Sequence, residues 1–250
     1  MRGGRQFQPQ GPALALLLAL ALLVGNQLTV AAADTTQHVA SESGLSTAAR
    51  GRAYFTTCAG CHGTQAQGNS GMHAPNLTVQ GGPYLLEQLR HFAHDIRGGP
   101  TDFYGWQMNG RARALSDDVA LRDVVAFIET LPRVRASLIV KGNVTRGREL
   151  YSACASCHGA RGEGRAGAAG DALDSVSGDG QTAPVGPVPA LAGLDDYYQL
   201  AQLEAFTSGA RGRNQHDDPQ GAVMRAAAAG ITSKEAARDV IAYIATLQVR

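Results

Sequence analysis

The feature that most constrains this chain is a pattern of residues that occurs twice. Residues 51–63 read GRAYFTTCAGCHG and align without a gap with GRELYSACASCHG at residues 147–159. Residues 115–131 align in the same way with residues 231–247 near the end of the chain. Self-similarity of this kind indicates a duplicated structural unit. We therefore expect two similar domains in tandem rather than one large domain.

The repeats divide the chain into three parts. We expect a leader at residues 1–33, a first domain at 34–134 and a second domain at 135–250, with a short linker within residues 132–145. Each repeat reads as a helix that ends in the cysteine motif, a long loop, a middle helix, another loop and a terminal helix. Alternation of β-branched residues is weak, so the fold is predicted to be all-α with glycine-rich loops.

The terminal helices carry the clearest periodicity. Apolar residues spaced by four and three predict one buried stripe in each helix: Val124, Ile128 and Leu131 in the first repeat, and Val240, Ile244 and Leu247 in the second. Ser116 and Thr232 precede these helices at equivalent positions and are predicted to be their N-caps. Thr232 and Glu235 match a capping box.

The first residues have the pattern of a secretory signal peptide. Arg2 and Arg5 precede a short apolar run at residues 13–24, and small residues at 31–33 offer a cleavage site before Asp34. The run is shorter than the roughly 20 residues that span a bilayer. We expect export to the periplasm, with an uncleaved signal that anchors the protein as the alternative.

Charge excludes one class of function. The leader contains two of the 22 basic residues and none of the 21 acidic ones, so the remainder of the chain is close to neutral. This balance lacks the basic patch of a nucleic-acid-binding protein.

The four cysteines of the chain form two identical motifs. Cys58 and Cys61 precede His62, and Cys154 and Cys157 precede His158. The pattern C-x-x-C-H is that of c-type haem attachment, in which two thiols bond the porphyrin and the adjacent imidazole binds iron. Small loop-rich domains bury little apolar surface, and a haem would complete each core. The sequence predicts two covalently bound haem c groups.

The cysteines allow two other interpretations. The pairs could form one four-cysteine zinc site, or two disulfides in an oxidising compartment. Both leave the repeated histidine without a role, which favours haem attachment.

Two methionines are candidates for the sixth iron ligand. Met108 precedes Leu131 by the same number of residues as Met224 precedes Leu247, and each is expected in the loop before a terminal helix. Methionine opposite histidine raises the reduction potential of haem iron. Simple core filling is the alternative role for these residues.

The other candidate ligands have no partner in the second repeat. Met72 and His73 lie in a loop that the second repeat does not match, and His91 and His94 align with small residues. We interpret His91 and His94 as surface or haem-edge residues and His216 as loop polarity.

These motifs resemble class I cytochrome c domains, and their tandem order resembles the periplasmic dihaem cytochrome c-four group. The resemblance covers nearly all of the chain after the leader. It implies that a glycine and an aromatic residue of the first helix face an aromatic residue of the last: Gly51 and Phe55 with Phe127, Gly147 and Tyr151 with Tyr243. It also implies that the backbone carbonyls of Pro75 and Pro189 orient the two histidines.

The second repeat departs from the first in a Gly- and Ala-rich insertion at residues 163–186. It is either a flexible segment without a specific role or a cover or docking element at the second haem. Because the insertion makes the surroundings of the two haems unequal, we expect unequal reduction potentials.

The resemblance implies a periplasmic electron carrier and not an enzyme. Its expected partners are a donor such as a quinol-oxidising complex and an acceptor such as a terminal oxidase or reductase, and peripheral contact with the membrane is compatible with this role. The alternatives are the haem subunit of a periplasmic dehydrogenase and, less well supported, a two-haem peroxidase.

Overall fold

The computed structural model describes residues 45–115, 117–165 and 186–247. The described residues from Ser46 onward belong to one compact unit, which contains both repeats. The expected leader and most of the 163–186 insertion lie outside the described residues.

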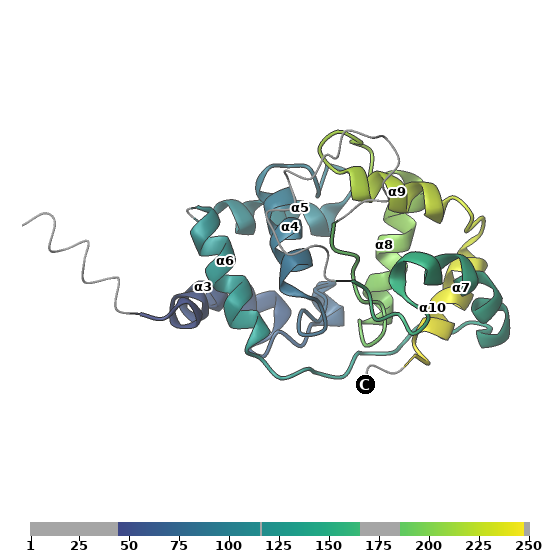
Figure 1. The fold of residues 1–250 in the computed structure, drawn as a ribbon, viewed down its shortest axis with the longest axis horizontal. Coiled ribbons are helices and arrows are strands. Elements are labelled where there is room, and N and C mark those ends of the chain that lie inside the picture. Colours follow the sequence, from purple (N-terminus) through teal and green to yellow (C-terminus); the bar gives the residue numbers. More distant parts are fainter. Residues whose placement is uncertain (1–44, 116, 166–185, 248–250) are drawn as a thin grey trace, which may run out of the picture. The chain divides into compact units, whose positions relative to one another are not determined.

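The described residues form α-helices, one short 3₁₀ helix and no β-strand. The first repeat contains α3 (Thr47–His62), the 3₁₀ helix η2 (Ser70–Met72), α4 (Gly82–Ala93), α5 (Phe103–Arg113) and α6 (Asp118–Glu129). The second contains α7 (Val144–His158), α8 (Asp196–Ser208), α9 (Pro219–Ala228) and α10 (Lys234–Ile244) (Figure 1). The all-α prediction and the tandem organisation are confirmed.

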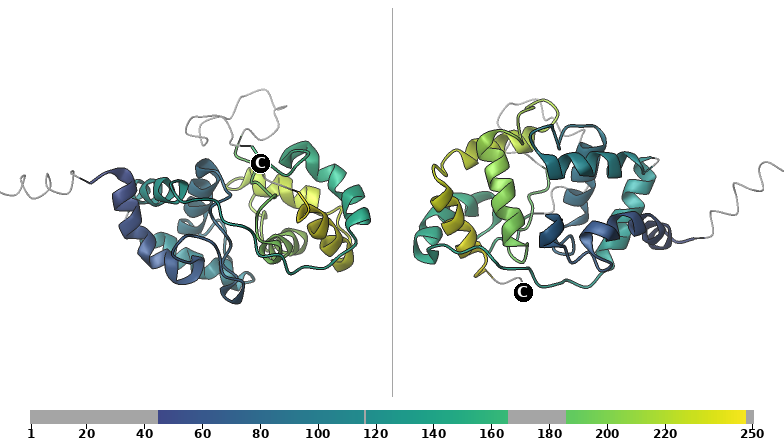
Figure 2. Two further views of the ribbon diagram at one scale, coloured as in Figure 1. Left: turned by 90° about the horizontal axis from the view of Figure 1, so that it is seen from below. Right: turned by 180° about the vertical axis from the view of Figure 1, so that it is seen from behind.

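In each repeat the helix with the cysteine motif crosses the terminal helix at a glycine. A Cβ on Gly51 of α3 would lie 1.8 Å from the backbone oxygen of Asp123 on α6, and one on Gly147 of α7 would lie 1.9 Å from that of Asp239 on α10. Only glycine permits this backbone approach. Figure 2 shows both pairs of helices from two further sides.

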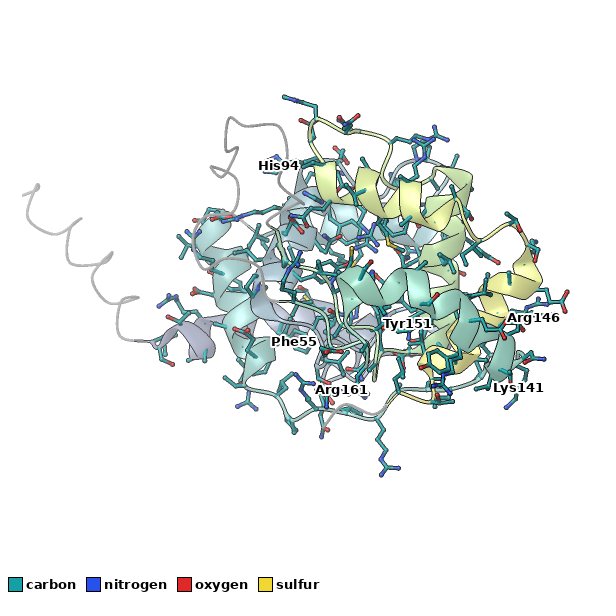
Figure 3. All side chains as sticks on the ribbon, turned by 45° about the vertical axis from the view of Figure 1, so that its right-hand side comes forward. Phe55, His94, Lys141, Arg146, Tyr151 and Arg161 are labelled. Carbon is teal, nitrogen blue, oxygen red and sulfur yellow. The ribbon has the colours of Figure 1, made fainter. Side chains whose placement is uncertain are left out.

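Aromatic pairs flank both crossings, as expected from the resemblance. Phe55 and Phe127 have ring centroids 5.3 Å apart, and Tyr151 and Tyr243 repeat the same separation of 5.3 Å. Figure 3 labels Phe55 and Tyr151 on the two cysteine-motif helices. Tilted rings at this separation add to the energy of burial.

An ion pair reinforces each crossing. Arg50 donates from Nε to Asp123 at 2.6 Å, and Arg146 pairs in the same way with Asp239. Both carboxylates are almost fully buried. The hydrogen bond from Arg146 lowers the pKa of Asp239 below its usual value, since an adjacent cation favours the charged carboxylate.

The terminal helices begin one residue later than expected. The cap of α10 is Ser233, whose hydroxyl accepts from the Ala236 amide, so the prediction of Thr232 was wrong. Glu235 binds Arg146 at 2.6 Å and does not close a capping box. The cap of α6 is Asp117, and Ser116 lies outside the described residues.

Each repeat has its own hydrophobic cluster. The predicted stripes contribute Val124 and Ile128 to the first cluster and Val240 and Ile244 to the second, all of them buried, with Leu131 and Leu247 packed at the edges. Cys58 packs against the first cluster and Cys154 against the second. Each cysteine motif therefore adjoins the core of its own repeat.

The segments that contain the methionines are helices, not the loops that we expected. Met108 lies on α5 and Met224 on α9. Neither helix has a long apolar stripe, but an aspartate caps each of them, Asp102 and Asp218. A capping side chain satisfies N–H groups that a helix start leaves unpaired, which favours a helix even where apolar periodicity is weak.

The linker lacks regular structure but is fixed by hydrogen bonds to two buried aspartates. Asp195 accepts from the amide of Ser137 at 2.7 Å, and Asp196 accepts from those of Ile139 and Val140, each at 2.7 Å. The linker follows α6 and leads into α7 (Figure 1). It therefore belongs to the folded structure.

The repeats exchange equivalent hydrogen bonds through what we call the interface cluster: Tyr84, Gln88 and Arg97 of the first repeat and Tyr198, Gln202 and Arg211 of the second. Arg97 donates to the tyrosine and glutamine of the other repeat at 2.7 and 2.7 Å. Arg211 donates to Tyr84 and Gln88 of the first repeat at 3.2 and 2.7 Å. This reciprocity relates α4 and α8 by an approximate twofold.

Within the described residues, no helix is both long enough and apolar enough to cross a membrane.

Candidate haem sites

All four cysteines lie on the last turns of α3 and α7, and no disulfide joins them in the described residues. Burial raises the pKa of Cys58 and of Cys154. No three side chains of His, Cys, Asp or Glu gather as a metal site among the residues that the structure describes, which include every cysteine. Each pair lies on its own helix beside its own histidine, which favours haem attachment over a zinc site shared by both pairs.

The two histidines end their helices and are turned in the same way. His62 is buried, and its Nδ1 lies 2.9 Å from the carbonyl oxygen of Pro75. His158 is buried as well, with Nδ1 3.0 Å from the carbonyl oxygen of Pro189. Because the carbonyl accepts from Nδ1, Nε2 is the nitrogen left for iron. Burial lowers the pKa of both imidazoles, which favours the neutral form that ligates metals.

Glycines that we did not single out from the sequence shape the loop after each histidine. The Gly68 amide donates to the His62 carbonyl at 2.8 Å, and the Gly164 amide to that of His158 at 2.9 Å. A Cβ on Gly68 would lie 2.6 Å from the amide nitrogen of Asn76, which follows Pro75. A Cβ on Gly164 would lie 2.6 Å from that of Ala190, which follows Pro189. Their identical spacing from the two histidines is the sequence signal that could have identified them.

The two methionines occupy equivalent helices but differ in packing. Both are half-buried. Met224 packs against the same hydrophobic cluster as Cys154, whereas Met108 lies on α5 outside the corresponding cluster of the first repeat. Their role as iron ligands stays a prediction.

The competing candidate ligands are mostly at the surface. Met72, His73, His94 and His216 are exposed, and His73 stacks on Tyr104 with ring centroids 4.1 Å apart. His91 is buried, which contradicts a surface position, while its place at the haem edge stays a prediction. The sequence did not reveal this burial because His91 faces charged groups of the second repeat, among them Asp218 and Arg211.

Two buried guanidinium groups of the interface cluster each keep one nitrogen without a hydrogen bond among the described residues. Arg97 and Arg211 are almost fully buried, and the Nε of each has no hydrogen-bond partner within the described structure. Each guanidinium stacks on an aromatic ring, Arg97 on Phe92 at 4.5 Å and Arg211 on Phe206 at 4.6 Å. An anion beside a buried guanidinium offsets the cost of burying its charge, and the propionates of a haem would supply such anions.

The donor set of each repeat thus fits a covalently bound haem. Two thiols and a neutral imidazole converge at one helix end, an apolar cluster adjoins them, and buried cations lie on the middle-helix side. A bound haem supplies one-electron chemistry through ferrous and ferric iron.

This fold and these repeated donor sets define a c-type cytochrome. A family model for cytochrome c matches residues 48–132 and again residues 144–248. The chain belongs to the cytochrome c family and is an electron-transfer protein with two cytochrome c domains.

Two curated relatives are similar over a large part of the chain. The thiosulfate dehydrogenase electron acceptor of Stutzerimonas stutzeri is 29% identical over 181 residues, which cover 68% of this chain and 71% of that protein. A cbb3-type cytochrome c oxidase subunit of Rhizobium leguminosarum is 32% identical over 144 residues, covering 54% of this chain and 48% of the relative.

Solved structures share the fold of the paired domains. Cytochrome c4 from Pseudomonas stutzeri has a TM-score of 0.56 and 23% identity, covering 79% of this chain and 97% of that one. The thiosulfate dehydrogenase TsdBA of Marichromatium purpuratum has a TM-score of 0.57 and 26% identity, covering 79% of this chain and 39% of its own.

Proposed function

We propose that the protein is a dihaem electron carrier of the periplasm. Cys58 and Cys61 hold one haem and Cys154 and Cys157 the other. His62 and Met108 are the axial ligands of the first iron, and His158 and Met224 those of the second. The observation that carries this proposal is the repetition of one donor set, with each buried histidine hydrogen-bonded through Nδ1 to the backbone carbonyl of a proline in the following loop.

The chain's own residues prepare both sites for outer-sphere electron transfer. Pro75 and Pro189 hold the imidazoles in one tautomer, so the ligands need no rearrangement when charge changes. Met108 on α5 and Met224 on α9 would each supply a further ligand to the iron of their own repeat and so leave no site there for a substrate. Such a centre exchanges electrons with partners and does not bind reactants at iron.

The partners are other redox proteins. We favour a carrier between a quinol-oxidising complex and a terminal oxidase or reductase, because the similar proteins include an oxidase subunit. The name of another similar protein, a thiosulfate dehydrogenase electron acceptor, favours a second role as the haem subunit or direct acceptor of a periplasmic dehydrogenase. Stable co-purification with a dehydrogenase would support the second role and contradict the free carrier.

Export is tested by fractionation and mass. We expect the haem-bearing protein in the periplasmic fraction, with a mass that corresponds to a chain starting at Asp34 plus two haems. A protein that keeps the whole leader and is found in the membrane fraction would support the anchored alternative.

Axial ligation is tested by visible spectroscopy of the oxidised protein. Met108→Ala and Met224→Ala should each remove part of the methionine–iron charge-transfer band, while the exposed Met72 serves as the control and Met72→Ala should leave the band unchanged. A full band in both Met108→Ala and Met224→Ala would show that the ligand assignment is wrong.

A further inference from the structure

The peptide groups that orient the two histidines differ in what their N–H groups bind. The amide of Asn76, in the same peptide group as the Pro75 carbonyl, donates to the Asp195 carboxylate at 2.7 Å. The corresponding amide of Ala190 donates to the neutral side-chain oxygen of Gln80 at 3.1 Å, and Gln80 donates back to the Ala190 carbonyl at 2.8 Å. Each acceptor comes from the opposite repeat.

Asp195 is built into this position as a buried carboxylate. It is 1% exposed. One oxygen accepts from the Asn76 amide and the other from the Ser137 amide, each at 2.7 Å, and the Tyr197 hydroxyl lies 3.2 Å away. Burial raises the pKa of Asp195, and the two amide donors and the hydroxyl oppose this rise. A donor on each oxygen matches the hydrogen-bonding needs of the ionised form.

A hydrogen-bonded chain connects this carboxylate to the first histidine. The Asn76 N–H donates to Asp195, and the Pro75 oxygen of the same peptide accepts from His62 Nδ1. Hydrogen bonds in series polarise one another, so a negative charge at the amide end makes the carbonyl a stronger acceptor. A stronger acceptor makes the imidazole a more electron-rich ligand.

Both consequences of the negative charge favour the ferric state of the first haem. An electron-rich imidazole stabilises the more positive iron, and a buried anion attracts that extra charge directly, since Coulomb interactions are strong in a low-dielectric interior. The second haem has a neutral amide at the equivalent place.

We propose that Asp195, a residue of the second repeat, is a positioning residue that lowers the reduction potential of the first haem below that of the second. Electrons then rest preferentially on the second haem. This inference rests on the two-haem function proposed above.

The test is a potentiometric titration of the full holoprotein with three single variants. Asp195→Asn should raise the potential of the first haem, with about a tenfold change in its oxidised-to-reduced ratio at fixed applied potential, which is about 59 mV for one electron. The second haem should shift far less. Gln80→Glu should lower the potential of the second haem.

Asp196→Asn is the matched control, because it removes an equally buried charge at the next position without touching the Asn76 peptide. It should shift the first haem less than Asp195→Asn does. A Met224→His background, which lowers the second potential by replacing the thioether, identifies which titration step belongs to which haem.

Several results would overturn the proposal. The reduction potential of the first haem could be unchanged in Asp195→Asn, or both haems could shift equally in that variant. The first haem could also shift as much in Asp196→Asn as in Asp195→Asn. If Asp195→Asn does not fold, Gln80→Glu decides alone, and an unchanged second haem overturns the proposal. A wild-type protein without two haems and two one-electron steps would instead refute the proposed function.

Discussion

Gly51 and Gly147 are the residues at which helix backbones approach most closely. Each places the backbone of a cysteine-motif helix against a carbonyl of the terminal helix. Because the cysteines follow on the same helices, the glycines also set the position of the thiols relative to the core. A single methyl group at either position must separate the two helices.

Gly51→Ala should destabilise the protein by at least about 2 kcal/mol, because the new Cβ would meet the Asp123 oxygen at 1.8 Å. Gly60→Ala on the same helix is the control, since a Cβ there meets nothing within 4 Å. Thermal unfolding monitored by circular dichroism measures both. Equal melting temperatures for the two variants would contradict the role of the crossing.

At the residue scale, the sequence predicted groups that lie close together along the chain. The C-x-x-C-H motif brings thiols and imidazole together within one helical turn, whatever the rest of the fold does. Asp195 could not be predicted, because its partner amide at Asn76 lies 119 positions away and carries no side-chain signature. Contacts between a side chain and a distant backbone leave little trace in a single sequence.

At the scale of elements, α5 and α9 were the hardest to predict. Their sequences, FYGWQMNGRAR and PQGAVMRAAA, have little apolar periodicity. They are helical because aspartate caps satisfy their first amides and because glycines allow close packing: a Cβ on Gly98 would lie 2.4 Å from the Gly105 oxygen. The terminal helices, with strong stripes, were predicted correctly, although their caps were displaced by one residue.

Asp102→Ala should destabilise α5 and so make it easier for Met108, which lies on this helix, to leave the iron. Loss of the cap, whose carboxylate accepts from the Gly105 amide at 2.9 Å, costs about 1 kcal/mol. We expect roughly fivefold tighter binding of added imidazole to the first ferric haem. Asp117→Ala removes a similar cap from α6, which carries no ligand, and should lower stability without this gain. Equal imidazole affinity in both variants would count against the methionine assignment.

For the whole molecule, buried polar groups join the two repeats. The interface cluster exchanges hydrogen bonds between α4 and α8, and Asp195 and Asp196 hold the linker. The duplication could be predicted from the aligned motifs. The way in which the repeats join could not be predicted from the sequence. It depends on polar residues that would be exposed to water in an isolated domain.

Glu87 should make stability depend on pH. Burial, and then the nearby Asp218, raise its pKa from 4.5 to about 7. When folding raises the pKa of a carboxyl, the protonated group stabilises the folded protein. This stabilisation is complete at a pH below the pKa of the unfolded chain, and it is lost as the pH rises through the pKa of the folded protein. Between pH 5 and 8 the free energy of unfolding of the wild type should fall by about 1–2 kcal/mol more than that of Glu87→Gln. This value allows for solvent screening, because Glu87 is partly exposed.

Denaturant unfolding of the holoprotein at several pH values measures this difference. Glu149→Gln on α7, which removes an exposed carboxyl, is the control. Parallel stability curves for the wild type and Glu87→Gln would show that Glu87 is not protonated at neutral pH.

The separation of Asn76 and Asp195 along the chain also bears on how the protein is assembled. Synthesis starts at the N-terminus, so the first repeat is complete before α8 exists. A cofactor attached to Cys58 and Cys61 at that stage meets a His62 whose peptide partner is still hydrated. The first redox centre therefore reaches its final surroundings only when the C-terminal half has folded.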